Sequence, residues 1–497
     1  MTEKIDPKNI YDDSRELVGF VPRKKATPAT YNDLGFISGL EIHQQLLTRK
    51  KLFCRCPAGL YQKGDDFDAE LIRHMRPTLS ELGEYDGTAL MEFKTRKNIF
   101  YRIKDETACT YDIDDTPPFP IDREALNISI EIALLLKTNV VGELHITRKQ
   151  YLDGSIPTGF QRTAIVGIEG AIPLTDKTVR IIQLSIEEDS CREVSDVGHR
   201  RIYMTDRLGM PLIEMVTYPD MKTPDEVAEA GHYLRYLARS TGKVRTGIGA
   251  GRQDVNVSID GGRRVEIKGV AHISWIPELT HIEAFRQKAL LEITKSLKSK
   301  IRDENEWKPT SATIDPNSLS SDQTMIHSVN AQGDCLTAVN LPKFAGILAF
   351  FTQPEKMFAN ELSDRLKVIA CLERPNMSHS EAFERGGTGS QFRLPVLIEE
   401  DWAKVRKLLK AGPEDAQIVF RGPEADVATA LDTIAERCRL AFDGVPFETR
   451  KSFSDGTTIF ERVLPGADRM YPDTDSAPIP IEENEIEEIA GDLPVAV

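Results

Sequence analysis

The sequence predicts a protein of mixed helices and strands, with a small two-layer α/β module inserted into a larger body. Around residue 255, polar and apolar residues alternate on both sides of an Asp-Gly-Gly turn, which is typical of a β-hairpin. Around residue 230, apolar residues recur at helical spacing after a capping sequence. Between residues 331 and 440 the expected order strand, helix, strand, helix predicts the inserted module.

The pattern of polar and apolar residues changes between residues 1–30 and residues 36–46. Residues 1–30 are polar and aperiodic, so we expect a loose extension. The run 36–46 alternates polar and apolar side chains, which predicts a strand with Glu41, His43 and Gln45 on one face. Glu and His two positions apart on a rigid strand offer two metal ligands, but an exposed polar strand face has the same pattern.

Capping residues indicate the helices. Thr223 is a good N-cap, and Glu226 completes a capping box ahead of an apolar stripe. Asp122 can cap a second helix through residues 128–136, and a third helix is expected over residues 283–299.

Carboxylates follow or interrupt two other apolar strands. Glu187, Glu188 and Asp189 end one strand, and Glu214 interrupts the strand 210–216. A buried, unpaired carboxylate costs several kcal/mol, which a cation or a neighbouring arginine relieves. One histidine with several carboxylates suits a hard cation with open positions for phosphate oxygens; magnesium fits best, and zinc remains possible.

The hairpin near residue 255 has one strongly polar face, made by Asp254, Asn256, Ser258, Glu266 and Lys268. Such a face usually contacts bulk water. Five different hydrogen-bonding groups on one rigid sheet would equally suit the floor of a binding site.

Two further motifs are ambiguous. The glycine-rich run 247–251 is followed by a strand rather than a helix, so it is either a tight loop or a nucleotide contact with Arg252 beside it for a phosphate. Cys54 and Cys56 form a CxC pair without a second CxxC, so free thiols are favoured over a zinc site completed by Cys109.

The remaining elements follow in order along the chain. Residues 303–330 are polar and predict a linker. The stretch 482–492, with six acids and no base, is expected to begin a helical region. The elements expected in the inserted module are a strand at 393–398, a helix at 400–409, a strand at 417–421 and a helix at 423–440.

The composition is that of an ordinary globular protein, with 28% charged and 40% hydrophobic residues and a net charge of −15. It excludes a disordered chain, a collagen and a generally basic nucleic-acid binder, so any nucleic-acid site is a local patch. The absence of a bilayer-spanning apolar run, a charged start and seven sparse cysteines predict a cytoplasmic protein without a membrane segment.

Six motifs, in order over about 440 residues, resemble the catalytic subunits of tRNA-dependent amidotransferases. They are GLEIH at 39–43, DGSIPTGFQRT at 153–163, EED at 187–189, DRLGMPLIE at 206–214, RQDVNVS at 252–258 with EIK at 266–268, and RMYPDTD at 469–475. The motif at 153–163 contains FQR, and the insertion contains NLPKFAG at 340–346. Both features are similar to the archaeal E-type branch of this family rather than to the bacterial B-type branch.

The resemblance implies an α+β fold. A cradle-shaped catalytic domain of mixed antiparallel sheet would comprise residues 31–325, and residues 441–497 would return to it. The insertion at 331–440 would resemble a domain of bacterial-type aspartyl-tRNA synthetases. Family members continue into a helical domain and a tail domain that grip tRNA, whereas this chain ends at Val497.

The resemblance also implies an activity. Such subunits use ATP and Mg²⁺ to phosphorylate the glutamyl side chain of Glu-tRNA(Gln), and ammonia then displaces the phosphate to give Gln-tRNA(Gln). The ammonia comes from a partner, an asparaginase-like glutaminase of the D type, in a heteromeric assembly. The absence of a recognisable nucleophile agrees with this, because phosphoryl transfer depends on positioning and fixed cations.

Matching positions imply the site residues. The expected magnesium ligands are His43, Glu188 and Glu214, with Glu41 and Glu187 as neighbours or further ligands. The expected catalytic residues are Glu188, Glu214, His43, Arg207 and Lys268. The expected nucleotide and substrate contacts are Ser155, Thr158, Gln161, Arg252, Asp254, Asn256 and Glu266.

Two other interpretations compete with this one. A non-catalytic scaffold that binds tRNA or a partner is favoured by the end at Val497, but it has no need for His43 beside buried carboxylates. A generic metal-dependent phosphohydrolase requires the order of the six motifs to be a coincidence.

Overall fold

The structure is a computed structural model that describes residues 6–494 except 78–84, 86, 152, 248, 322–324, 327–328, 330–332, 385–392 and 465–469. The chain divides into two compact units. Unit 1 comprises Met1–Phe36, Ser258–Val265 and Glu278–Arg462, and unit 2 comprises Ile37–Val257, Glu266–Pro277 and Val463–Val497. Both units contain helices and mainly antiparallel strands, which agrees with the predicted α+β class.

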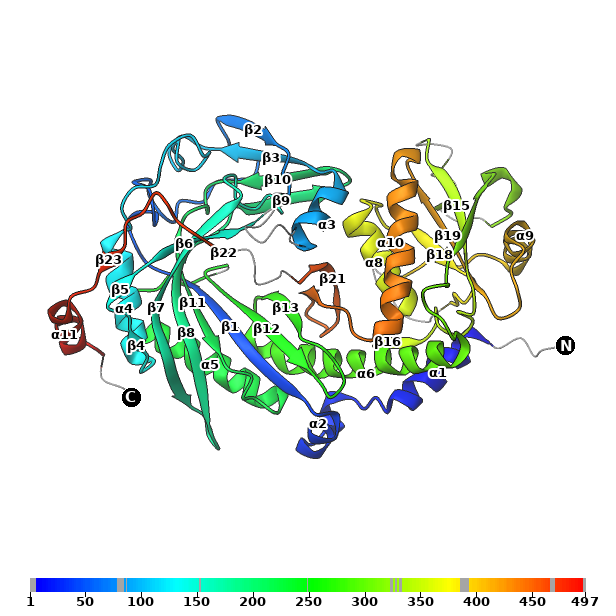
Figure 1. Cartoon of the computed structure of the whole chain (residues 1–497), viewed down its shortest axis with the longest axis horizontal. Coiled ribbons are helices and arrows are strands. Elements are labelled where there is room, and N and C mark those ends of the chain that lie inside the picture. The colour runs from blue at the N-terminus through cyan, green and yellow to red at the C-terminus, as the bar shows by residue number, and fades with distance from the viewer. Residues whose placement is uncertain are drawn as a thin grey trace. The chain divides into compact units, whose positions relative to one another are not determined.

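Unit 2 contains the sheet that carries most of the predicted site residues (Figure 1). Its strands pair in the order β13 (Val265–Val270), β12 (Gly251–Ser258), β1 (Ile37–Gln45), β11 (Pro211–Thr217), β8 (Thr178–Glu188), β7 (Phe160–Pro173), β6 (Ile146–Gln150) and β22 (Met470–Pro472), with β4 (Asn139–Val140) on β7.

One face of this sheet is apolar because side chains alternate along each strand. Leu40, Ile42, Leu184, Ile186 and Met215 lie on it and are almost completely buried. Helices α4 (Arg123–Leu135) and α5 (Pro224–Ser240) pack against β1, β7 and β8. Glu41, His43, Glu187 and Glu214 of the same strands therefore share the opposite face.

The helix caps of unit 2 were predicted well. Asp122 caps α4 by accepting from the N–H of Ala125, and Thr223 caps α5 by accepting from the N–H of Glu226. The predicted capping box is only half formed, because the Glu226 carboxylate accepts from the N–H of Lys222 instead of Thr223.

A second sheet of unit 2 was not predicted. Its strands pair in the order β2 (Ala69–Arg73), β3 (Asn98–Ile103), β10 (Arg200–Met204) and β9 (Arg192–Val197), and β3 and β10 are parallel. The other elements of unit 2 are α3 (Gly87–Thr95), the 3-10 helix η2 (Ile273–Trp275), α11 (Glu483–Gly491) and the strand pair β5 (Glu143–Leu144) and β23 (Ile479–Pro480).

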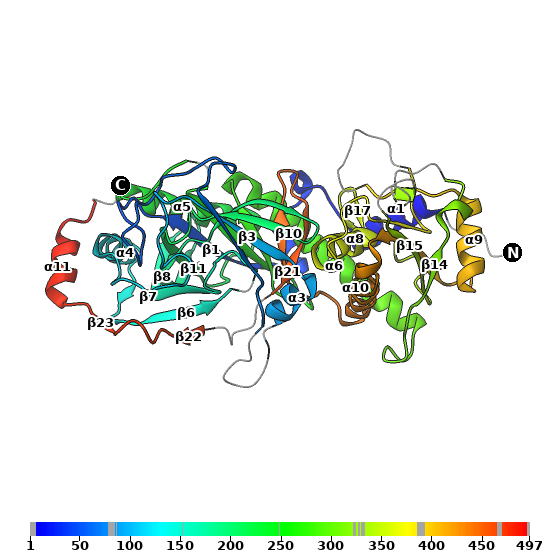
Figure 2. The same cartoon turned by 90° about the horizontal axis from the view of Figure 1, so that it is seen from above.

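Unit 1 combines a four-stranded antiparallel sheet with several helices (Figure 2). The sheet has the order β14 (Thr310–Ile314), β15 (Cys335–Leu341), β19 (Ala416–Gly422) and β18 (Met377–His379). The other elements are α1 (Pro7–Val18), η1 (Arg23–Lys25), α2 (Pro28–Leu34), α6 (Ile276–Lys300), η3 (Pro316–Ser318), β16 (Phe351–Gln353), β17 (Lys356–Met357), α8 (Phe358–Ile369), α9 (Glu399–Leu409), α10 (Glu424–Asp443), β20 (Glu448–Ser452) and β21 (Thr458–Val463).

Three expectations for unit 1 were wrong. The supposed extension 1–30 contains α1, whose Tyr11, Ser14 and Val18 are buried; the serine within this stripe hid its helical periodicity. The supposed linker 303–330 contains β14, whose Ile314 is buried in the core of this unit. Residues 393–398 form no strand, because Pro395 lacks the N–H that a ladder needs.

The predicted 331–440 module is part of a larger unit. Its two helices and its second strand are present as α9, α10 and β19. Unit 1 extends beyond both ends of this range, from residue 278 to residue 462, and also includes the N-terminal residues through Phe36. Residues 463–497 belong to unit 2.

His281 of α6 is expected to make the stability of unit 1 depend on pH. Its Nδ1 lies 3.0 Å from the Tyr31 hydroxyl and its Nε2 lies 2.8 Å from the Val21 carbonyl, contacts that suit a neutral imidazole. Burial lowers the pKa of His281 to about 4, from about 6.5. The unfolded chain therefore binds the proton more tightly, and stability is lost as pH falls from about 6.5 towards 4.

We expect the free energy of unfolding to fall between pH 7 and pH 5 by about 2 kcal/mol more in the natural protein than in His281→Gln, since only the natural chain must protonate a buried imidazole. Urea unfolding at both pH values measures this difference. Equal pH dependence in the two proteins would show that His281 has an ordinary pKa in the folded state.

None of the helices in the described ranges is both long and apolar enough to cross a membrane.

Candidate metal centre

The polar face of the large sheet brings three predicted ligands together. In the antiparallel register, His43 of β1 lies opposite Glu214 of β11, and Leu212 of β11 lies opposite Glu187 of β8. His43 Nε2 is 3.2 Å from Glu214 Oε1 and 3.6 Å from Glu187 Oε1. One potential ligand atom from each of the three residues lies within 4.8 Å of the others.

The charges of this cluster are strongly coupled. Burial on its own would lower the pKa of His43, but the hydrogen bond to Glu214 and the charges of Asp254, Glu214 and Glu187 raise it to about 9. Burial and the nearby Glu214 raise the pKa of Glu187. Lys149, His43 and Lys268 outweigh burial at Glu214 and hold its pKa well below the usual range.

A second acidic cluster lies on the same face. Potential ligand atoms of Glu41, Asp254 and Glu266 also lie within 4.8 Å of one another. Lys268 Nζ is 3.2 Å from Asp254 Oδ2 and 3.0 Å from Glu266 Oε1, and Asn256 donates to Glu41 Oε1 at 2.9 Å. Asp254 and Glu266 are buried, so this part of the polar hairpin face is a charged, enclosed surface rather than one that contacts bulk water.

The two clusters are electrostatic neighbours. Burial, followed by the charges of Glu266, Glu214 and Asp254, raises the pKa of Glu41 to about 7. Burial raises the pKa of Asp254, but Lys268 and His43 bring it down to about 2. Five carboxylates therefore face two lysines and one histidine, an excess of negative charge that favours a bound cation.

Glu188 does not join these clusters, which corrects the predicted ligand set. Consecutive residues of a strand point to opposite faces, so Glu188 lies on the apolar side of β8 with Ile186. Its carboxylate accepts from the Tyr111 hydroxyl at 2.6 Å and from the Arg162 backbone N–H at 3.1 Å. Burial raises the pKa of Glu188 to about 7.

Arg207 and Arg252 meet at one buried carboxylate. Arg252 donates to both oxygens of Asp189, at 2.9 and 3.3 Å, and Arg207 Nε lies 3.6 Å from Asp189 Oδ1. Gln45 donates to Asp189 Oδ2 at 2.7 Å. Both arginines therefore have an internal partner, and both side chains are also partly exposed, so their contact with a phosphate stays a prediction.

The polar atoms of the predicted substrate loop make local contacts. The Ser155 hydroxyl donates to Asp153 Oδ1 at 2.6 Å, and the Thr158 hydroxyl donates to the Phe160 carbonyl at 2.8 Å. Gln161 Nε2 donates to the backbone carbonyl of Glu188 at 2.6 Å. These bonds fix the loop and the start of β7. Of the other predicted positions, Ile248 and Arg469 lie outside the described residues.

Lys149 is a site residue that sequence reasoning missed. It lies on β6, and its Nζ is 4.0 Å from Glu187 Oε2. β6 was not predicted because its five residues include two positive charges and do not alternate clearly between polar and apolar side chains. A basic residue two strands away from Glu187 is brought near only by the pairing of β6 with β7 and of β7 with β8.

A separate thiol cluster lies elsewhere in unit 2. Potential ligand atoms of Cys54, Cys56, Cys109 and Asp112 lie within 4.8 Å of one another, and Lys51 Nζ is 3.5 Å from Asp112 Oδ1. Thiolates and a carboxylate at this spacing can hold zinc. The CxC pair alone favoured free thiols, because the other two groups come from a distant loop.

Fold and site together define an α+β protein with a cluster of one histidine and several carboxylates, a candidate cation site, on the polar face of the largest sheet among the described residues. The family described as GatB/GatE catalytic domain matches residues 36–487. The chain therefore belongs to the GatB/GatE family, which confirms the resemblance seen in its six motifs.

Individual relatives agree with this assignment. The chain is 39% identical over 472 residues to the E subunit of glutamyl-tRNA(Gln) amidotransferase from Methanocaldococcus jannaschii, covering 93% of this chain and 71% of that protein. It is 40% identical over 461 residues to the E subunit from Saccharolobus islandicus, covering 92% and 70%. It is 38% identical over 463 residues to the E subunit from Sulfurisphaera tokodaii, covering 93% and 71%.

Proposed function

We propose that this chain is the ATP-dependent, amide-forming subunit of an amidotransferase that converts Glu-tRNA(Gln) to Gln-tRNA(Gln). Membership of the GatB/GatE family and the names of the relatives support the amidotransferase assignment. The observation that supports catalysis in this chain is the cluster of His43, Glu187 and Glu214, with Lys149 and Lys268 beside it. A non-catalytic scaffold does not need this cluster of buried charges, whose burial costs free energy.

Magnesium is the metal that the proposal assigns to this cluster. Glu187 Oε2 is buried without a hydrogen-bond partner among the described residues, so a ligand position is available. His43, Glu187 and Glu214 would hold the ion, with Glu41, Asp254 and Glu266 as the adjacent donor set. Bound Mg²⁺ would offset negative charge on phosphate oxygens.

The chain's own residues would bind and orient the reactants. In the proposed reaction the glutamyl carboxylate attacks the γ-phosphorus of ATP and ADP leaves. Ammonia then attacks the acyl carbon and phosphate leaves. Lys149 and Lys268 are fixed cations beside the carboxylates and would stabilise charge on the transferred group.

The proposed ammonia source is a partner protein, the asparaginase-like glutaminase of the D type, in the cytoplasm. The test is to incubate the purified chain with Mg²⁺, ATP, ammonium chloride and Glu-tRNA(Gln), and to identify the amino acid recovered from the tRNA. We expect glutamine, and only glutamate when ATP is omitted. With glutamine as nitrogen donor, product is expected only after the partner glutaminase is added.

Recovery of glutamate alone, under conditions where the chain binds Glu-tRNA(Gln), would contradict an amide-forming site and favour the scaffold. ATP hydrolysis that is independent of tRNA would instead favour a phosphohydrolase.

A further inference from the structure

A pocket of about 420 Å³ lies in unit 2, outside the cation site. It is formed by the segment after β2, the C-terminal half of α3 and the start of β3. Figure 1 shows α3 beside the small sheet that contains β3 and β10. Its volume falls within the range of about 300–1,000 Å³ that is usual for small-ligand sites.

The lining of this pocket is basic, although the chain is acidic overall. Arg76 and Arg96 are exposed at it, and His74 is a further cation when protonated. Glu92 is the acid among the described lining residues, and it lies 3.7 Å from Arg201. The position of Arg96 at the C-terminal end of α3 is explained by the helix dipole, but His74 and Arg76 come from a different segment.

The pocket also has an apolar side. Met75 and Ile99 line it from within the small core that includes Tyr101 and Tyr203. Phe93 of α3 presents a ring that is 53% exposed. An exposed aromatic ring beside exposed arginines is the combination that binds single-stranded nucleic acid, where bases stack on rings and cations meet the phosphates.

The wall of this pocket contacts the loop that leads to the cation site. A Cβ at Gly154, where φ is +82°, would lie 2.8 Å from Ile99 Cγ1, so the loop passes directly against this side chain. Arg73, at the end of β2, donates to the Pro157 carbonyl of the same loop. From there β7 carries Gln161 and Thr163 onto the sheet, where Thr163 lies opposite Glu187.

We infer that this pocket binds a nucleotide of a single-stranded RNA end, with its phosphate against Arg76 and its base against Phe93. The choice of RNA rests on the proposed function, in which the aminoacylated 3′ end of a tRNA must reach the cation site. Free ATP has the same phosphate and base chemistry. It is therefore the alternative ligand of this pocket, and the test distinguishes it from RNA.

The test uses the full chain and two probes. Fluorescence anisotropy measures binding of a labelled single-stranded octamer with the 3′-terminal sequence of tRNA(Gln), and calorimetry measures binding of Mg·ATP. In Phe93→Ala we expect the dissociation constant for the octamer to rise about 5- to 100-fold. In Arg76→Gln we expect weaker binding and a salt dependence whose slope is smaller by about 0.7.

Two matched variants control for general effects. Phe447→Ala removes a ring that is equally exposed, at 51%, and Arg49→Gln removes an exposed cation away from the pocket. We expect both controls to bind the octamer normally, and Mg·ATP binding to be unchanged in all four variants. Unchanged octamer binding in Phe93→Ala and Arg76→Gln would overturn the inference. Weaker binding of Mg·ATP alone in these two variants, with octamer binding unchanged, would overturn it as well and would indicate a site for free ATP.

Failure of this inference can be separated from failure of the proposed function. Glu214→Gln alters the cation site and leaves the pocket intact, so we expect it to bind the octamer normally while losing amide formation. Normal octamer binding by the pocket variants, together with inactivity of Glu214→Gln, would refute the RNA pocket alone.

Discussion

Replacement of Glu214 by Gln is expected to lower ATP-dependent glutamine formation at least about 100-fold while the protein remains folded. The amide preserves the volume of the side chain but removes the negative charge 3.2 Å from His43 Nε2. Loss of one preorganised electrostatic group at a reaction centre commonly lowers kcat by about 10²- to 10³-fold. Here the same change also removes a candidate metal ligand.

Cation binding gives a readout that is independent of turnover. Mn²⁺ titration followed by electron paramagnetic resonance is expected to show weaker binding in Glu214→Gln and in His43→Ala. Glu143→Gln, an exposed carboxylate paired with His145 elsewhere in unit 2, is the matched control and is expected to keep both binding and activity. Full activity in both site variants would remove the metal assignment.

The double variant carries further information. If His43 and Glu214 act through one bound ion, removing both is expected to reduce activity little more than removing either alone, because each single change already disrupts the site. Multiplicative losses would indicate two independent contributions, and the cation would then lie elsewhere on the polar face.

Local sequence signals predicted the elements that depend on neighbouring residues. Thr223 caps α5 and Asp122 caps α4 because a capping bond spans three residues. The hairpin of β12 and β13 was readable because alternation and an Asp-Gly-Gly turn occur within about 15 residues. The helix α1, whose buried stripe contains Ser14, was missed.

The composition of the site depends on strand register, which the sequence does not specify. His43 meets Glu214 only because β1 and β11 are neighbours in this register. The side of Glu188, in contrast, does follow from the sequence: Glu187 and Glu188 are adjacent on one strand, so alternation alone places them on opposite faces. The resemblance to known subunits supplied residue types at matching positions, not the direction of each side chain.

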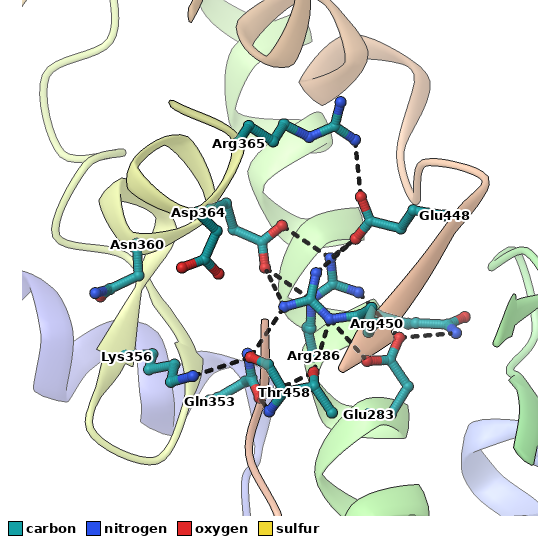
Figure 3. Close-up of polar contacts among 12 residues, drawn as sticks. Glu283, Arg286, Gln353, Lys356, Asn360, Asp364, Arg365, Glu448, Arg450 and Thr458 are labelled. Atoms are coloured by element: carbon teal, nitrogen blue, oxygen red, sulfur yellow. Dashed lines mark hydrogen bonds and ion pairs between the residues drawn. The ribbon is translucent and has the colours of Figure 1, made fainter. Parts of the chain in front are cut away.

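A different kind of charge cluster stabilises unit 1. Figure 3 shows part of this buried network, in which Glu283 and Arg286 of α6 approach Arg365 of α8 and Glu448 and Arg450 of β20. Glu448 is completely buried and pairs with Arg286, Arg450 and Arg365. These arginines lower the pKa of Glu448, against the effect of its burial.

Glu448→Gln is expected to reduce the free energy of unfolding of unit 1 by about 3–5 kcal/mol, because removing one partner leaves buried charges uncompensated. Glu292→Gln, which breaks a pair with the exposed Lys295 on α6, is expected to cost less than about 1 kcal/mol. Urea unfolding followed by the fluorescence of the buried Trp307 and Trp402 measures both changes in this unit. Since Glu448 belongs to unit 1 and the cation site to unit 2, Mn²⁺ binding by the folded variant is expected to be unchanged. Equal losses in the two variants would mean that the arginines find other partners, and that burial of this carboxylate contributes little to the fold.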